Sequence, residues 1–267
     1  MERERAAIDA MIRKFCTALV PALVSLVAPE AALADGAVAT IERVKTSIVA
    51  IGTYERTRSP GFQFRATGFA VGDGTLVATN AHGLPLSLDS EHRETLAIMI
   101  PGRGREPQMR EARTVVVDPD SDLALLRIEG APLPPLKLGP DGAREGQSVL
   151  FTGFPIGAVL GIIPATHRGM ISALTPIAIP TPAAANLDAR IVRRLTTGPF
   201  IVLQLDATAY PGNSGSPLYD PDTGEVLGII NMVLVKSTRE STISEPSGIT
   251  YAIPARHLKN LLDRVHG

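Results

Sequence analysis

The chain has 267 residues, of which 45% are hydrophobic and 20% charged, and it carries 24 Gly, 22 Pro, one Cys and no Trp. This composition excludes a disordered or fibrous chain, and the frequent Gly and Pro residues favour turns over long helices. A formal net charge of -1 supplies no basic field for counterion release, so nucleic acid is not an expected partner.

The N-terminal segment has the pattern of an export signal. Arg13 and Lys14 precede a short apolar stretch, and an Ala-Leu-Ala ending follows it. The sequence therefore predicts a signal peptide over residues 1–34, cleaved after Ala34, with Met11 as the favoured start of translation. The apolar stretch is too short and too interrupted by proline to span a bilayer well. We expect an exported protein, in a bacterial periplasm or secreted, without stable membrane insertion after cleavage; a retained N-terminal anchor is the alternative.

Short β-rich runs punctuated by Gly, Pro and Asp follow from residue 47 onward. The expected strands are 47–51, 62–71, 75–79, 96–100, 114–117, 123–128, 148–151, 169–173, 200–204, 226–235 and 249–253. Regular short strands with turn signals between them predict an all-β fold, as a sandwich or a pair of barrels. The Pro-rich stretch 131–142 separates two halves of similar size. Residues 35–267 are thus expected to form one domain, with barrels over about 47–130 and about 143–253.

Only two helices are expected. Glu42 lies in a short one, and residues 255–265 form an amphipathic helix that docks on the body. The apolar stripe of this second helix comprises Leu258, Leu261, Leu262 and Val265. Residues 176–199 are expected to form one long surface loop.

The segment Gly212-Asn-Ser-Gly-Ser-Pro217 carries the most specific chemical signal. A nucleophilic serine needs a tight turn that presents its hydroxyl while two backbone N–H groups converge to hold an oxyanion, and glycines permit that approach. The donors here are predicted to be the amides of Gly212 and Ser214. An ordinary turn between strands is the alternative for this segment alone.

Two further segments strengthen the interpretation. His82 follows the expected strand 75–79, and Asp122 opens the expected strand 123–128. A serine hydrolase triad needs an imidazole within reach of the serine hydroxyl and an acid that fixes the imidazole. The chain therefore contains the three residue types of a triad, in the order His, Asp, Ser.

A metal site is not expected. Asp118, Asp120, Asp122 and Glu129 match positions 1, 3, 5 and 12 of a calcium-binding EF-hand loop, but Leu stands where that loop needs Gly, and the flanking segments are strands. The single cysteine and five scattered histidines provide no credible zinc ligand set. No cofactor is expected either.

Taken together, the motifs resemble the chymotrypsin-like (trypsin-like) serine proteases, and within them the Deg/HtrA branch. The resemblance rests on Gly68-Phe69, Thr79-Asn-Ala-His82, Asp118 to Leu126, Gly153-Phe-Pro155, Gly169 to Leu174, Asp206-Ala207, Gly212 to Pro217 and Gly248 to Pro254, and it covers residues 47 to about 262. It implies two six-stranded antiparallel β-barrels with a C-terminal α-helix. It also implies His82 as general base, Asp122 as orienting acid, Ser214 as nucleophile, and the amides of Gly212 and Ser214 as the oxyanion hole.

The chain departs from the Deg/HtrA pattern at two points. Ser216 stands where that branch usually has a second glycine, a change also found in the exported glutamyl endopeptidases. No peptide-binding PDZ domain is expected after the terminal helix, so the sequence is expected to be a protease domain only. The resemblance leaves a trimer open, but the aromatic contacts of such trimers are not evident near the N-terminus.

The resemblance implies a first substrate pocket near Thr208, Asn231, Met232 and Val233. None of these residues is charged. Because a pocket without a buried acid cannot compensate for the desolvation of Lys or Arg, trypsin-like cleavage is disfavoured. Cleavage after acidic residues is also disfavoured, because Ile229-Ile230 stand where glutamyl endopeptidases use histidine. We expect Val, Ala, Leu or Ile before the cut bond.

The leading functional hypothesis is an exported serine endopeptidase that acts on unfolded or damaged proteins, with protein or peptide chains as its partners. The alternative from another class is a catalytically silent protease fold that binds proteins through a collapsed oxyanion loop. An esterase is a third hypothesis. It is disfavoured because the usual esterase fold places the serine in a strand-turn-helix of a parallel sheet, and nothing helical is expected after Ser214.

Overall fold

Two closed antiparallel barrels account for the strands of the computed structural model, which describes residues 28–102, 104, 106–157, 161–177, 200–231 and 248–266. The N-terminal barrel comprises β1 (Ile48–Tyr54), β2 (Phe62–Val71), β3 (Leu76–Asn80), β4 (Thr95–Ile100), β5 (Gln108–Asp118) and β6 (Leu123–Ile128). The C-terminal barrel comprises β7 (Ser148–Gly153), β8 (Ala165–Ile177), β9 (Phe200–Asp206), β10 (Pro217–Tyr219), β11 (Val226–Asn231) and β12 (Ile249–Pro254). The predicted fold class, two six-stranded barrels with a C-terminal helix, is confirmed.

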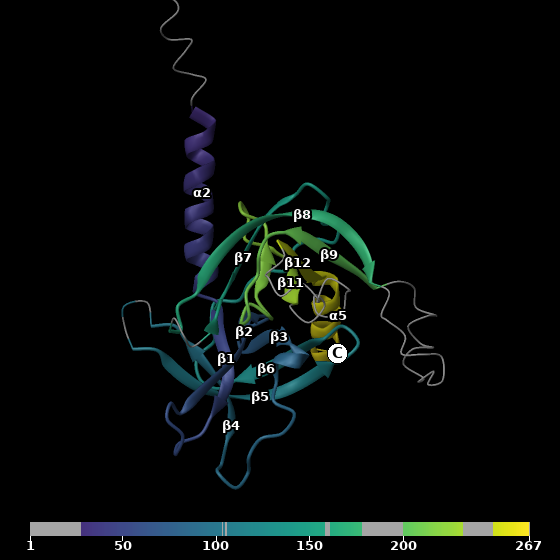
Figure 1. Ribbon diagram of the computed structural model, residues 1–267. Helices are drawn as coiled ribbons and strands as arrows, with labels where there is room; N and C mark the ends of the chain where they lie inside the picture. Colours follow the sequence, from purple (N-terminus) through teal and green to yellow (C-terminus); the bar gives the residue numbers. More distant parts are fainter. Residues whose placement is uncertain are drawn as a thin grey trace, which may run out of the picture.

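The two barrels share one topology. Their strand orders are β1-β2-β3-β6-β5-β4 and β10-β11-β12-β9-β8-β7, and every ladder within them is antiparallel. Figure 1 shows the N-terminal barrel, coloured blue to teal, beneath the C-terminal barrel, coloured green. Closure removes the free strand edges that would otherwise be available for pairing with another chain.

Strand β1 is buried on both faces because the barrels pack against each other. In β1, Val49 and Ile51 belong to the interior of the N-terminal barrel, whereas Ile48 and Ala50 belong to a separate cluster that joins the two barrels. Successive side chains of a strand face opposite sides, so one strand supplies both cores. This explains why β1 is a continuous apolar run rather than an alternating one.

The terminal helix connects the barrels. Helix α5 (Ala255–His266) follows β12 directly and packs against β11 and β12 of its own barrel and against β5 and β6 of the other. Leu258 and Leu261 are fully buried in the cluster between the barrels, and Arg264 donates to the Asp118 carboxylate at 3.1 Å. The predicted helix is confirmed over 255–265.

The other helix is longer than the sequence indicated. Helix α2 (Ala28–Lys45) contains Glu42, as expected, and runs through the position after Ala34 where cleavage is predicted. Its last turns are held by the Thr40 hydroxyl and the Arg43 guanidinium, which donate to the backbone carbonyls of Asp222 and Thr223. Its first turns project from the body in Figure 1.

Strand boundaries differ from the predictions at a few places. Strand β10 was missed because it has only three residues and follows directly on the Ser-rich turn. Strand β5 was predicted too short, as 114–117, because most of its other residues are polar and do not show an apolar strand pattern. Strand β8 extends through Ile177 into the predicted loop. The remainder of that loop, most of the predicted signal peptide and residues 232–235 lie outside the described residues. Among the described helices, none combines the length and the apolar character needed to cross a membrane.

One histidine of the C-terminal barrel couples folding to pH. His167 on β8 stacks on Phe151 with ring centroids 4.8 Å apart, and its Nε2 is buried without a hydrogen-bond partner among the described residues. Burial lowers the pKa of the His167 imidazole below its ordinary value. The unfolded chain therefore takes up this proton at a higher pH than the fold does, and stability is lost as the pH falls below about 6.5.

We predict that His167→Phe reduces the loss of unfolding free energy between about pH 7 and about pH 5, because a flat apolar ring keeps the stack without a proton to bind. Urea unfolding at a series of pH values measures this. His92→Gln is the control, because the hydrogen bond that the His92 ring donates to the Asp89 carboxylate raises the pKa of that exposed histidine and favours the fold in acid. Equal pH slopes for wild type and His167→Phe would contradict the prediction.

Candidate active site

The three predicted triad residues meet where the barrels face each other. His82 lies in the short 3-10 helix η1 (Ala81–Gly83) directly after β3, and Asp122 directly precedes β6. Strands β3 and β6 are paired, with Asn80 opposite Leu123, so the two residues are brought to one edge. Ser214 lies in the loop between β9 and β10 of the other barrel.

The side chains form one hydrogen-bonded line. His82 Nδ1 lies 2.6 Å from Asp122 Oδ2, and His82 Nε2 lies 3.0 Å from Ser214 Oγ. Both distances are within hydrogen-bonding range, and the two ring nitrogens face different partners. With its Nδ1–H directed to the carboxylate, the neutral ring has Nε2 available to accept the serine proton.

Asp122 is held by more than the imidazole. Its Oδ1 accepts the backbone N–H of His82 at 2.9 Å, and its Oδ2 also accepts Asn231 Nδ2–H at 2.7 Å. Its backbone carbonyl accepts Asn80 Nδ2–H at 3.1 Å and the Ala81 N–H at 3.0 Å. Asp122 has a φ of 53°, a left-handed conformation that aspartate tolerates better than most residues. These contacts fix both the backbone and the carboxylate of the acid.

The serine loop depends on two glycines with positive φ. Gly212 has a φ of 101° and Gly215 a φ of 87°. A Cβ at Gly212 would collide with the Phe154 carbonyl oxygen, and one at Gly215 with the Thr67 carbonyl oxygen. Only glycine combines these dihedrals with such close backbone approach. Ser214 itself is 7% exposed.

Thr67 on β2 ties this loop to the N-terminal barrel. Its N–H donates to the Ser214 carbonyl at 2.9 Å, and its hydroxyl donates to the Gly212 carbonyl at 2.7 Å. The same hydroxyl accepts the Phe154 N–H at 3.1 Å. Thr79 in turn donates its hydroxyl to the Thr67 carbonyl at 2.8 Å. One buried residue thus holds the backbone on both sides of residue 213 from across the interface.

The peptide that precedes Gly212 is also fixed. The carbonyl oxygen of Pro211 accepts the N–H of Ile156 at 2.7 Å. In a trans peptide the C=O and N–H point in opposite directions, so this bond turns the Gly212 N–H away from Ile156. The carbonyl of Pro211 is thereby kept out of the space that the Gly212 N–H faces.

The structure describes two of the four residues predicted for the first substrate pocket, Thr208 and Asn231. Thr208 is partly buried. The backbone on both sides of it is fixed by the Thr250 hydroxyl, which donates to the Ala207 carbonyl at 2.7 Å and accepts the Ala209 N–H at 3.0 Å. Asn231 is fully buried, and its amide is directed to Asp122. Its side chain therefore supports the acid, a role that the pocket assignment did not anticipate. Met232 and Val233 lie outside the described residues.

Several residues of the site were not identified from sequence. Thr67 and Ile156 bind the backbone of the serine loop, Asn80 binds the backbone of Asp122, and Thr79 binds Thr67. Thr79 and Asn80 belong to the segment that precedes His82, so the motif itself was a signal. Thr67 and Ile156 gave none, because their partners lie far along the chain.

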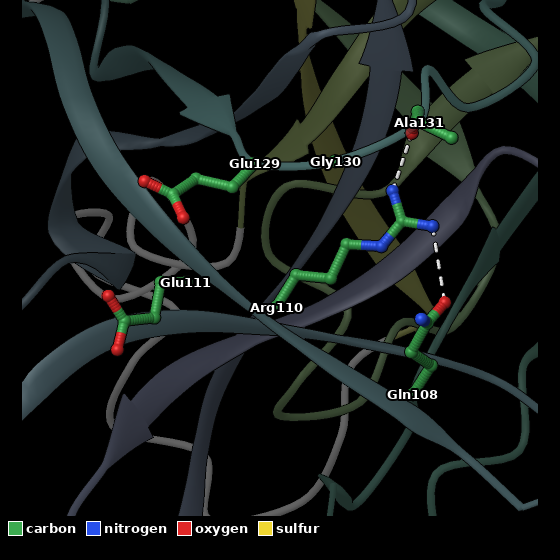
Figure 2. Close-up of a pocket in the computed structure, with 6 residues that line it drawn as sticks. All are labelled: Gln108, Arg110, Glu111, Glu129, Gly130 and Ala131. Atoms are coloured by element: carbon green, nitrogen blue, oxygen red, sulfur yellow. Dashed lines mark hydrogen bonds between the residues drawn. The ribbon is translucent and has the colours of Figure 1, made fainter.

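A separate surface hollow lies away from the triad. Figure 2 shows its lining residues Gln108, Arg110, Glu111, Glu129, Gly130 and Ala131. Arg110 donates to the Ala131 carbonyl and the Gln108 amide oxygen, while the carboxylates of Glu111 and Glu129 lie on the other side of the hollow. The hollow is at the far end of β6 from Asp122, which the strand's length places about 20 Å away. It takes no part in the triad.

Comparison with known proteins identifies the class. The model of the "Trypsin-like peptidase domain" matches residues 66–229, so the chain belongs to the family of trypsin-like peptidases. A "Probable periplasmic serine endoprotease DegP-like" from Marinomonas sp. (strain MWYL1) is 34% identical over 159 residues, which are 58% of this chain and 27% of that protein. "Serine protease HTR4" from Bos taurus is 29% identical over 237 residues, 85% of this chain and 40% of that protein.

These relatives confirm the resemblance to the Deg/HtrA branch of serine-type peptidases. The chain spans less than half the length of either relative. Among solved structures, the active form of the Rv3671c protease from M. tuberculosis has a TM-score of 0.60 and 21% identity. That match covers 85% of this chain and 83% of the other. It shows the same chymotrypsin-like fold.

The contacts of Thr67 lead to a first prediction for the site. Thr67→Val keeps the shape of the side chain but removes the partner of the partly buried Gly212 carbonyl and of the buried Phe154 N–H. We expect the unfolding free energy to fall by about 1–3 kcal/mol and kcat/KM for peptide hydrolysis to fall about tenfold or more, because the serine loop shifts. Thr67→Ser retains the hydroxyl and should keep most of the rate. Equal rates for the valine and serine variants would refute this role of the hydroxyl.

Proposed function

We propose that the protein is a serine endopeptidase in which Ser214 is the nucleophile, His82 the general base and Asp122 the acid that orients the imidazole. The observation that carries the proposal is the line of two hydrogen bonds through His82, 2.6 Å to Asp122 and 3.0 Å to Ser214. A serine hydroxyl is a weak nucleophile until an adjacent base accepts its proton, and this geometry provides such a base.

The reaction follows from that arrangement. Ser214 Oγ attacks the scissile carbonyl carbon while His82 Nε2 takes the hydroxyl proton. The imidazolium, stabilised by Asp122, then passes the proton to the leaving amine and leaves an acyl-enzyme. A water molecule, deprotonated by His82, attacks the acyl carbon and releases the second product with Ser214 restored. Asn231 contributes by donating to the same carboxylate oxygen that faces the imidazole.

The oxyanion hole is assigned to the amides of Gly212 and Ser214. Negative charge develops on the carbonyl oxygen when the serine attacks, and fixed N–H donors stabilise it without having to reorganise. The hydrogen bond from Ile156 to the Pro211 carbonyl supports this assignment, because it orients the Gly212 N–H away from Ile156. The same hydrogen bond argues against the alternative, a catalytically silent binding protein with a collapsed oxyanion loop, because it keeps the Pro211 carbonyl out of the space that the Gly212 N–H faces.

The substrates are proposed to be unfolded or damaged proteins outside the cytoplasm. Support for export comes from the apolar pattern that ends before Asp35 and from relatives whose names include the word periplasmic. Thr208, which is partly buried, and Asn231 are the two described residues of the predicted pocket, and neither is charged. Small to medium apolar side chains before the cut bond therefore remain the proposed preference.

The nucleophile is tested by labelling with a fluorophosphonate. We expect the wild-type protein to gain one covalent adduct and Ser214→Ala to gain none, with peptide hydrolysis reduced by at least about 10⁴-fold in the variant. Ser216→Ala is the matched control, because Ser216 lies two residues away and is fully buried. Intact-protein mass spectrometry counts the adducts. An adduct that persists in Ser214→Ala, or that is absent from the folded wild type, would overturn the proposal.

The substrate preference is tested with unfolded casein. After digestion by the mature protein, we expect the residues before the cut bonds to be mostly Val, Ala, Leu or Ile, because an uncharged pocket cannot compensate for desolvating a charge. Peptide mass spectrometry maps the cut sites, with Ser214→Ala as the blank. A profile dominated by Arg, Lys or Glu would contradict the proposed preference while leaving the peptidase assignment intact.

A further inference from the structure

Ile156, in the turn after β7, has a backbone conformation that its side chain disfavours. Its φ is 59°, in the left-handed region, which is a rare and costly conformation for a β-branched residue. The side chain is 47% exposed, so burial of apolar surface does not explain why an isoleucine occupies this position. Strained backbone persists only where the surroundings hold it, and it concentrates at functional sites.

The surroundings hold this turn through its backbone and through the other barrel. The Ile156 N–H donates to the Pro211 carbonyl at 2.7 Å, and the next N–H, of Gly157, donates back to the Phe154 carbonyl at 3.2 Å. The Phe64 ring from β2 meets the Phe154 ring edge-on, with centroids 6.0 Å apart. The Phe64 ring also lies so close to Gly157 that a Cβ at Gly157 would collide with it. The turn is therefore braced from the N-terminal barrel.

The bond to Pro211 controls the peptide that carries a proposed oxyanion donor. Because C=O and N–H of a trans peptide point in opposite directions, rotating the Pro211–Gly212 peptide by half a turn would exchange them. The Gly212 N–H would then be replaced by a carbonyl oxygen, which repels a developing oxyanion instead of stabilising it. The other end of Gly212 is fixed separately, by the hydroxyl of Thr67.

We infer that Ile156 is a positioning residue for the oxyanion hole. Its N–H holds the Pro211–Gly212 peptide in the orientation that presents the Gly212 N–H to substrate, and its side chain makes that conformation less stable than a glycine would. The orientation of the Pro211–Gly212 peptide thus depends on one backbone hydrogen bond, and the backbone strain at Ile156 opposes that bond. The turn is therefore a point at which the competent site can be lost without unfolding. This inference rests on the proposed function, since it matters only if Ser214 is acylated.

Two substitutions separate the N–H from the side chain. Ile156→Pro removes the N–H and fixes φ near -65°, so it can neither donate to Pro211 nor adopt the present conformation. Ile156→Gly removes the whole side chain but keeps the N–H and relieves the strain at φ 59°. The pair is matched in position, and only the proline variant abolishes the bond.

The readout is kcat and KM on a fluorogenic peptide with Val before the cut bond, together with the melting temperature. We expect Ile156→Pro to lower kcat by about 10²- to 10³-fold, the effect of losing one oxyanion donor, with KM within about threefold. Ile156→Gly should keep kcat within about threefold of wild type or raise it. A role in folding alone would lower the melting temperature without this split between kcat and KM.

Three results would overturn the inference. The first is a proline variant with kcat within about threefold of wild type, the second a proline variant changed in KM alone, and the third a glycine variant that loses as much kcat as the proline one. If the proline variant does not fold, the glycine variant decides, because a loss above about tenfold would assign the effect to the side chain. An inactive, unlabelled wild type would instead refute the proposed function, so the two failures are distinguishable.

Discussion

The site depends on hydrogen bonds that cross the interface between the barrels, and Thr67 makes the central set of them. Ser214 belongs to the C-terminal barrel and His82 and Asp122 to the N-terminal one, so their 3.0 Å contact requires the two barrels to keep one relative position. Thr67 secures it by binding the carbonyls of Gly212 and Ser214 while its own carbonyl accepts the Thr79 hydroxyl. Because Thr67, Thr79 and Ser214 are buried and Gly212 is partly buried, each unmade bond would leave a polar group short of solvent and would cost free energy.

Hydrophobic packing provides the frame in which those bonds can form. The cluster between the barrels contains Ile48 and Phe69 from one barrel, Tyr219 and Ile253 from the other, and Leu258 from α5. Burial of these side chains is strong but not directional. It fixes the barrels against each other, and the polar contacts then select the register at which His82 faces Ser214. The tight glycine turns follow from the same requirement, since the serine loop must approach the backbone of β2 closely.

Most of the fold could be predicted from the sequence, and so could the three residues that the structure joins in one hydrogen-bonded line, because their signals are local. Strands such as Phe62–Val71 carry their signal locally, and the turn chemistry of Gly212 and Gly215 is readable within six residues. Contacts between distant segments are not readable in that way. The dual demand on Thr67, the strain at Ile156 and the use of Asn231 for Asp122 each depend on a partner more than 50 residues away. The three-residue strand β10 was missed because it is too short to show a period.

We propose that the contacts of the serine loop hold Ser214 and the Gly212 amide ready for an oxyanion. A crystal structure of the protein after reaction with a fluorophosphonate tests it most directly. We expect a phosphonyl oxygen about 2.7–3.1 Å from the backbone nitrogens of both Gly212 and Ser214, with the Pro211 carbonyl still bound to the Ile156 N–H. An adduct with the Pro211 carbonyl turned toward that oxygen, or with its oxygen on neither amide, would contradict it.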